Sequence, residues 1–160
     1  MATETTSVRC LCGKVELEAW GIPILTTVCH CDGCREAADE LEKLPGAEPV
    51  KMADGGVPYV VFRKDRVTCL KGAEHLHEHR LKPDSPTRRV VATCCNSFLM
   101  LDFTHGHWIT LVRQRVEATQ AVEAAPHPAR TSPMFFVRLF ASWLPMGFRT
   151  PKIDYVNGVL

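Results

Sequence analysis

Seven of the eight cysteines in this chain of 160 residues fall into three short clusters. The clusters are Cys10-Leu11-Cys12, Cys29-His30-Cys31-Asp32-Gly33-Cys34 and Cys94-Cys95. Cys29 and Cys31 stand two residues apart, so in an extended strand both side chains leave the same face. A short turn through Asp32 and Gly33 can fold Cys34 back toward them. Three thiolates held in this way can occupy three corners of a zinc tetrahedron and leave the fourth corner open.

The N-terminal residues bear on how these cysteines are used. Residues 1–7 contain neither a basic nor an apolar signal region, so we expect a cytoplasmic rather than a secreted protein. Cytosolic thiols stay reduced, which argues against disulfides. Isolated buried thiols behave as small hydrophobic residues, and Cys69 fits that description. The clustering of the other seven cysteines instead favours metal binding.

The composition sets further limits. The chain is 46% hydrophobic and 23% charged, which is typical of a soluble globular protein. Its length suffices for one domain with a proper core. Its net charge of +1 gives no electrostatic case for nucleic-acid binding.

Short apolar or alternating segments predict strands through the first two-thirds of the chain. These segments are residues 14–20, 22–28, 59–62, 67–71, 75–81, 88–93, 98–103 and 108–112. Turn-forming residues separate most of them. Many short strands at close spacing predict a mainly β fold with antiparallel strands. Between the second and third strands, residues 34–44 (CREAADELEKL) predict a short amphipathic helix that ends before Pro45-Gly46.

The character of the chain changes after residue 115. Residues 117–125 are rich in alanine and predict a short helix. Ser132 can cap a second helix, and Pro133 suits the first helical position. We therefore expect a zinc-binding β domain in residues 1–115 and a helical, apolar C-terminal extension in residues 116–160 that packs on it.

The second of these helices, residues 133–145, is apolar nearly all round. It is too short to span a bilayer, which needs about 20 apolar residues. We expect it to be buried on the domain. A lid over the metal site, a contact between copies of the chain and a membrane-surface anchor remain alternatives.

Three motifs together resemble a known family. Cys10-x-Cys12-Gly13 precedes a predicted strand, Cys29-His30-Cys31-x-x-Cys34-Arg35 follows, and a cysteine pair comes later. In this order and at this separation they resemble the glutathione-dependent formaldehyde-activating enzyme family, which is shared with centromere protein V. The resemblance covers roughly residues 8 to 103. It implies a zinc-binding β-tent fold for a divergent member.

The resemblance also implies two metal sites, and so one or two Zn²⁺ ions per chain. Cys10 and Cys12 would hold a structural zinc with the late pair, Cys94 and Cys95. The second, more open site would be formed by Cys29, Cys31 and Cys34. In enzymes of the family this site supports carbon–sulfur chemistry on glutathione and formaldehyde.

The function implied is that of a carbon–sulfur lyase acting on thiol–aldehyde adducts, with a small thiol such as glutathione as partner. Arg35, next to Cys34, is the candidate substrate-binding residue, because it could offset the thiolate charge or meet a substrate carboxylate. A plain surface role for Arg35 is the alternative. The alternative function is a non-catalytic, zinc-stabilised β domain that mediates a protein or membrane-surface interaction. Residues 133–145 could then also join copies of the chain in a homo-oligomer.

Cys94 and Cys95 depart from the family pattern, in which two residues separate the late cysteines. Adjacent residues in a strand point to opposite faces, so both can reach one zinc only through a turn or a bulge. A tight turn at Asn96 could let both bind. Alternatively, one binds alone, or the two serve different sites. We rank the shared structural site first.

Three histidines lie near these motifs or near a turn. His30 stands between two proposed ligands, so it is expected to point away from them and to form a local contact. His105 and His107 flank a turn glycine and are expected on the surface.

Overall fold

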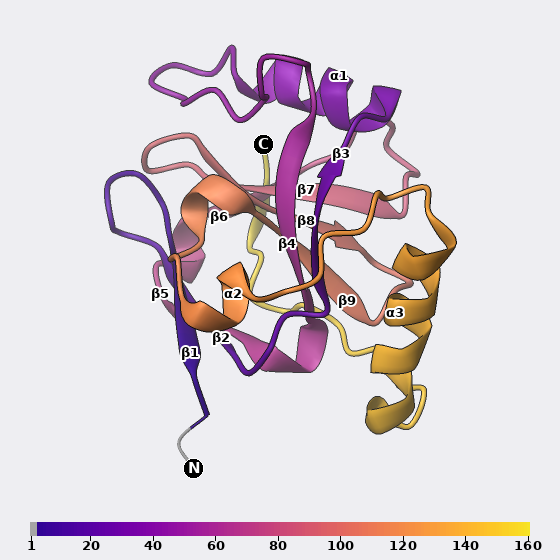
Figure 1. Cartoon of the computed structure of the whole chain (residues 1–160). Helices are drawn as coiled ribbons and strands as arrows, with labels where there is room; N and C mark the ends of the chain where they lie inside the picture. Colours follow the sequence, from indigo (N-terminus) through magenta and orange to yellow (C-terminus); the bar gives the residue numbers. More distant parts are fainter. Residues whose placement is uncertain (1–2) are drawn as a thin grey trace.

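The structure is a computed structural model of the chain and describes residues 3–160. Its strands are β1 (Thr5–Arg9), β2 (Glu16–Trp20), β3 (Leu25–Cys29), β4 (Val57–Arg63), β5 (Val67–Lys71), β6 (Leu76–His79), β7 (Thr87–Ala92), β8 (Ser97–Phe103), β9 (Trp108–Val112) and β10 (Gly158–Val159). They form a three-stranded sheet of order β1-β2-β5 and a seven-stranded sheet of order β10-β6-β7-β8-β9-β4-β3 (Figure 1). Neighbouring strands are antiparallel except β10, which runs parallel to β6.

One continuous apolar core joins the two sheets. Val8 and Leu17 enter it from the small sheet, and Val60, Leu99 and Leu111 enter it from the large one. All five side chains are fully buried. The mainly β fold predicted from the sequence is therefore confirmed, and the predicted strands 67–71 and 108–112 match β5 and β9 at both ends.

Two strands were not predicted, and each has a physical reason. β1 consists of Thr5-Thr6-Ser7-Val8-Arg9, which has a single apolar residue, although Thr6 and Val8 both point into the core. β10 has only two residues and is held by its parallel pairing with β6, where Gly158 lies opposite His77. Neither segment shows the apolar alternation that predicts a strand.

Helix α1 (Asp32–Leu41) follows β3 directly. It buries Ala37, Ala38 and Leu41, and the last two pack with Tyr59 and Phe98 of the large sheet. The prediction had placed this helix at residues 34–44. It begins two residues earlier because Cys31, in an extended conformation, takes the N-cap position.

The C-terminal part contains two helices. α2 (Gln120–Glu123) is shorter than the predicted residues 117–125, and the Thr119 hydroxyl caps it by accepting a hydrogen bond from the Val122 amide at 3.3 Å. α3 (Pro133–Trp143) begins as predicted. The Ser132 hydroxyl accepts from the Phe135 amide at 3.3 Å, and Pro133 occupies the first turn.

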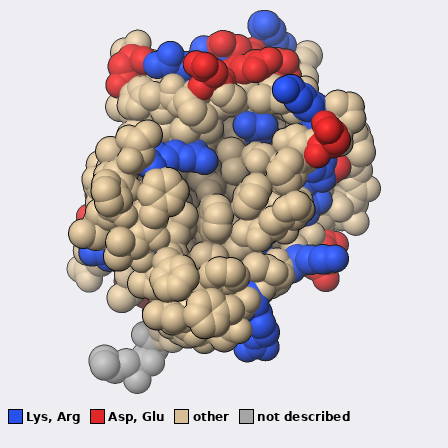
Figure 2. Space-filling model, turned by 90° about the vertical axis from the view of Figure 1, so that its right-hand side faces the viewer, with Lys and Arg blue, Asp and Glu red and all other residues tan. Residues whose placement is uncertain are grey.

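α3 is not buried all round, which corrects the expectation from the sequence. Phe135 and Leu139, one helical turn apart, are its buried residues, and they pack on Ile24, Leu25 and Val61. The outer side of the helix carries exposed apolar residues: Met134, Phe136, Val137, Phe140 and, just after it, Leu144. On this side of the molecule Figure 2 shows a broad area without charged side chains. A single sheet face can cover only one stripe of a helix. Within residues 3–160, no helix has the length and apolar character needed to cross a bilayer.

The unequal burial of α3 makes a stability prediction. Leu139→Ala removes a buried side chain and should lower the free energy of unfolding by about 2 kcal/mol. Phe140→Ala removes an exposed side chain of the same helix and should change it by less than about 0.5 kcal/mol. Urea denaturation of both variants tests the pair. Equal losses would contradict the packing of α3 described here.

Candidate metal centres

The loop between β1 and β2 brings Cys10 and Cys12 together. The Gly13 amide donates to the Cys10 carbonyl at 3.2 Å, and Gly13 has φ +78°, a conformation that glycine adopts without strain. The Val15 amide also points at the Cys10 Sγ, at 3.3 Å. The two Sγ atoms consequently lie 3.7 Å apart.

Cys94 and Cys95 lie in the turn between β7 and β8, outside both strands. Asn96 adopts a left-handed conformation with φ +55°. The chain reverses here, so the rule that neighbours in a strand face opposite ways does not apply, and the two Sγ atoms are 3.9 Å apart. Of the three arrangements left open by the sequence, the structure therefore has the tight turn at Asn96.

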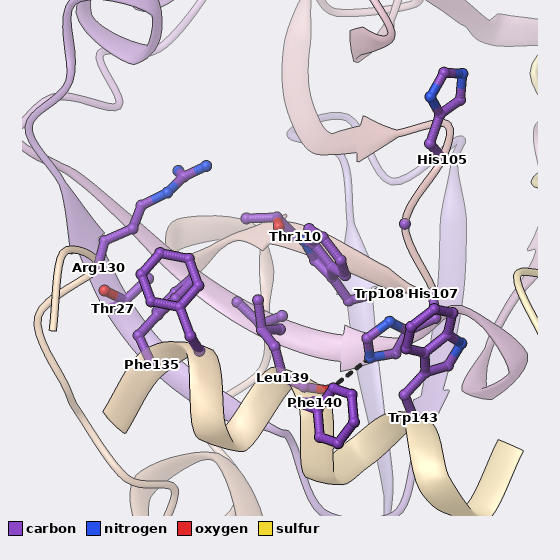
Figure 3. Close-up of a pocket in the computed structure, with 13 residues that line it drawn as sticks. Thr27, His105, His107, Trp108, Thr110, Arg130, Phe135, Leu139, Phe140 and Trp143 are labelled. Atoms are coloured by element: carbon purple, nitrogen blue, oxygen red, sulfur yellow. Dashed lines mark hydrogen bonds between the residues drawn. The ribbon is translucent and has the colours of Figure 1, made fainter. Parts of the chain in front are cut away.

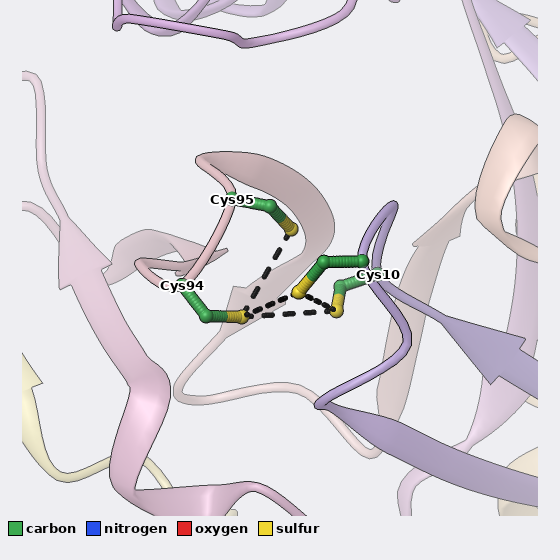
Figure 4. Close-up of side chains that lie close together, drawn as sticks. Cys10, Cys94 and Cys95 are labelled. Atoms are coloured by element: carbon green, nitrogen blue, oxygen red, sulfur yellow. Dashed lines mark hydrogen bonds between the residues drawn. The ribbon is translucent and has the colours of Figure 1, made fainter.

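The two loops place four thiols in one cluster (Figure 4). Cys94 Sγ lies 3.4 Å from Cys12 Sγ and 3.8 Å from Cys10 Sγ, and all four sulfurs lie within 4.8 Å of one another. Thiolates bound to zinc at about 2.3 Å are about 3.8 Å apart at the corners of a tetrahedron. The cluster thus has the donor atoms and nearly the spacing of a closed four-thiolate metal site.

The thiols of this cluster differ in acidity. Burial raises the pKa values of Cys10 and Cys94. Burial also opposes ionisation of Cys95, but hydrogen bonds from Ser97 and the Cys12 backbone outweigh it and lower its pKa to about 6. Ser97 Oγ accepts from the Leu11 amide at 2.9 Å and lies 3.0 Å from Cys95 Sγ, so it links the two loops. A metal cation that binds these thiols can displace the protons that they share.

The second cluster forms where β3 passes into α1. Cys29 ends the strand, Cys31 is the N-cap, and Cys34 lies in the first helical turn. Cys29 and Cys31 have their Sγ atoms 3.2 Å apart, and all three sulfurs lie within 4.8 Å of one another. Cys29 and Cys34 are buried whereas Cys31 is exposed. This group can hold a metal ion by three thiolates and has one side open to solvent.

One thiolate is favoured in this cluster. A hydrogen bond from Cys34, helped by the Cys31 backbone amide and the charge of Arg130, lowers the pKa of Cys29 to about 5 despite burial. The same bond, together with burial, raises the pKa of Cys34. Ionisation is therefore easier at Cys29 than at Cys34.

Arg130 belongs to this site and was not predicted from the sequence. Its Nη1 lies 3.6 Å from Cys34 Sγ, although Arg130 comes 96 residues later in the chain. The segment before it runs beside β3, because the Thr26 amide donates to the Pro126 carbonyl at 2.8 Å and Thr27 Oγ1 donates to the Pro128 carbonyl at 3.0 Å. No local pattern marks Arg130, since this contact depends on the docking of the whole segment.

The other predicted residues have different surroundings. Arg35 lies on the exposed side of α1, whereas Arg130 contacts Cys34. His30 points away from the thiols and bonds to Asp54 Oδ2 at 3.0 Å, as expected. His107 is buried, which corrects the expectation of a surface position, while His105 is exposed. His107 leaves the surface because α3 covers it: its Nε2 lies 2.8 Å from the Leu139 carbonyl oxygen.

Comparison with known proteins finds one family whose model matches the N-terminal part of the chain. Residues 5–47, which contain Cys10, Cys12, Cys29, Cys31 and Cys34, match the model of the glutathione-dependent formaldehyde-activating enzyme family. The match covers residues 5–47 of 160, so the chain resembles this family over its N-terminal part. No curated protein matches it. This match and the two cysteine clusters support metal binding.

A solved structure shares the fold. It is a crystal structure of a Rhodobacter sphaeroides protein, a structural-genomics target, with a TM-score of 0.50 and 16% sequence identity. The similarity covers 76% of this chain and 99% of that one. At this identity the likeness shows the fold alone.

The shared four-cysteine cluster predicts that its members act as a unit. Cys94→Ser and Cys95→Ser should each lower bound metal by about one equivalent and destabilise the fold by about 2 kcal/mol or more, because metal binding contributes to folding. Cys69→Ser, at a half-buried cysteine outside both clusters, is the matched control and should change neither quantity. Elemental analysis and thermal melting give the two readouts. A Cys95→Ser protein with full metal content would exclude Cys95 as a ligand.

The turn at Asn96 makes a separate prediction. Asn96→Gly and Asn96→Val both remove the hydrogen bond from Asn96 Nδ2 to the Pro45 carbonyl, 2.8 Å long. The two variants differ in the cost of adopting the left-handed conformation. That cost is about 1–2 kcal/mol for a β-branched residue such as valine. Asn96→Val should therefore be less stable than Asn96→Gly by about that amount in urea denaturation. Equal stability would mean that the turn is not left-handed.

Proposed function

We propose that this protein is a zinc-dependent carbon–sulfur lyase that acts on thiol–aldehyde adducts, with a small thiol such as glutathione as its partner. The observation that supports this best is the open side of the three-cysteine cluster. Cys29 and Cys31 line a cavity of about 680 Å³, together with Arg130 and Phe136. A structural site has no need of such an opening, whereas a catalytic site must admit a substrate.

The three thiols fit a catalytic metal site by their donor chemistry. A zinc ion held by Cys29, Cys31 and Cys34 would favour the thiolate form of a substrate thiol. In the synthetic direction the thiol sulfur adds to the aldehyde carbon, the carbon–sulfur bond forms, and the thiol proton ends on the carbonyl oxygen. In the lyase direction the carbon–sulfur bond breaks and the hydroxyl proton returns to sulfur.

Arg130 has a defined part in this proposal. A divalent ion bound by three thiolates leaves one net negative charge, and Arg130 lies against Cys34, where it offsets that charge. It also lines the cavity, so it can meet a carboxylate of the thiol substrate. We therefore assign to Arg130 the role that the sequence had suggested for Arg35.

The rest of the chain supports this site. In our proposal Cys10, Cys12, Cys94 and Cys95 hold a structural zinc in the β domain of residues 1–115. The extension of residues 116–160 packs on that domain and supplies Arg130. The proposal therefore gives two zinc ions per chain, one in the closed four-cysteine site and one in the open three-cysteine site.

The exposed side of α3 favours a second candidate function. Five large apolar side chains are more than half exposed there: Met134, Phe136, Val137, Phe140 and Leu144. A patch of this kind marks a contact with a protein, a second copy or a membrane surface. A non-catalytic, zinc-stabilised domain could use it in that way.

Loss of the thiolate distinguishes the two candidates. Cys29→Ser should abolish thiol-dependent aldehyde turnover by the zinc-replete protein while leaving the circular dichroism spectrum and the metal at the four-cysteine site unchanged. Turnover is followed with glutathione and an aldehyde, either formaldehyde or 3-phenylpropanal, by the loss of free aldehyde. If the wild-type protein has no such turnover, or Cys29→Ser retains it, the lyase proposal is wrong.

Two arginines provide a matched comparison. Arg130→Met should lower kcat/KM by at least about tenfold, because one charge-assisted contact is worth about 1.5–3 kcal/mol. Arg35→Met removes an exposed arginine next in sequence to Cys34 and should leave kcat/KM within about twofold. A larger effect at Arg35 would return the substrate-binding role to that residue.

A further inference from the structure

A second cavity, of about 480 Å³, lies between α3 and the large sheet (Figure 3). Thr27, Val61 and Thr110 line it from the strands, and Phe135 and Leu139 line it from the helix. We call it the apolar chamber, because its lining consists mainly of carbon atoms. The reaction proposed above for a thiol and formaldehyde gives this chamber no role.

The apolar chamber adjoins the cavity of the three-cysteine cluster. Arg130 and Phe136 line both spaces. Figure 3 shows Arg130 at one end of the chamber, with His107 and Trp143 at the other. A molecule whose sulfur lies beside Cys29 and Cys31 can therefore extend past Arg130 into the chamber.

Aromatic rings form the far end of the chamber, and contacts with neighbouring groups hold them in place. The His107 ring stacks on Trp143 with centroids 5.2 Å apart and an angle of 9°, and its edge meets Trp108 at 5.2 Å and 80°. His107 Nε2 donates to the Leu139 carbonyl oxygen at 2.8 Å, which fixes the ring against α3. Burial lowers the pKa of His107, which disfavours the charged form of its ring. Such a wall suits an aryl or alkyl group.

The chamber's size and polarity limit what can occupy it. A cavity of about 150 Å³ lined by apolar side chains suffices for benzene. The chamber is about three times larger, so it has room for an aryl group with a short chain. The peptide groups and charged ends of glutathione would lose their hydration there. The polar side chains that line the chamber are few: Thr27, His105, His107, Thr110 and Arg130. Formaldehyde has no group to fill it.

From this geometry we propose that the aldehyde handled by the site is an apolar one, aromatic or of medium chain length. Its aryl or alkyl group lies in the apolar chamber while the adduct's sulfur lies beside Cys29 and Cys31. This inference rests on the proposed function and names its substrate class. In the lyase direction the carbon–sulfur bond breaks, the hydroxyl proton passes to the sulfur, and the thiol and the apolar aldehyde are released.

The first experiment measures binding alone, with a probe that does not react. The probe is 3-phenylpropanol, an unreactive analogue of an apolar aldehyde, titrated into the zinc-replete full chain. Trp108 and Trp143 line the chamber, so tryptophan fluorescence should change in a saturable way. Thr110→Phe fills the chamber and should abolish the change. Thr68→Phe, the same replacement at an exposed strand position, is the control and should preserve it.

A second pair of variants guards against misfolding at the buried Thr110. Phe140 lines the chamber and is 56% exposed, so Phe140→Arg should fold and weaken probe binding by about tenfold. Val137→Arg places the same charge on an exposed position of α3 outside the chamber lining and should not weaken it. Equal binding by both proteins, or no binding by the wild type, would overturn the inference.

Turnover then separates this inference from the function on which it rests. With one thiol, kcat/KM should be at least about tenfold higher for 3-phenylpropanal than for formaldehyde, and Thr110→Phe should remove that preference. Turnover of formaldehyde with no preference and no probe binding would overturn the inference and leave the lyase proposal intact. Probe binding lost in Thr110→Phe, without turnover of any adduct, would support the apolar chamber and overturn the lyase proposal.

Discussion

The four-cysteine cluster is the constraint on which the rest of the structure depends. Cys10 and Cys12 leave the small sheet, Cys94 and Cys95 leave the large one, and their sulfurs meet within 4.8 Å. The core between the sheets is apolar and non-directional, so it favours contact without fixing an angle. Four thiolates around one cation have a fixed tetrahedral geometry. A metal ion at this point would therefore set how the two sheets lie relative to each other.

The three-cysteine cluster is built in the opposite way. Its thiols come from six consecutive residues at a junction of strand and helix, so the local chain conformation brings them together. What surrounds them comes from far away, since the segment after α2 runs beside β3 and delivers Arg130. The metal-binding motif is therefore local, whereas its surroundings come from distant segments. Those surroundings, and so the substrate, can vary while the motif stays the same.

Helix α3 connects the site to the molecular surface. Phe135 and Leu139 fasten it to the large sheet, and the same two side chains form one wall of the apolar chamber. The helix covers His107 but leaves space beside it instead of closing on the sheet. This space is the apolar chamber. The exposed phenylalanines at its edge, Phe136 and Phe140, lie where a ligand would enter.

The sequence by itself determined the features that depend on near neighbours. The spacing of Cys29, Cys31 and Cys34 predicts their convergence, alternating residues predict most strands, and Ser132-Pro133 predicts where α3 begins. Only the tertiary structure decided that Cys94 and Cys95 face one cluster, because that depends on a left-handed turn at Asn96. It alone decided the position of Arg130, the burial of His107 and the apolar chamber. Those features arise from packing between segments distant in sequence, and no local periodicity records which distant segments will meet.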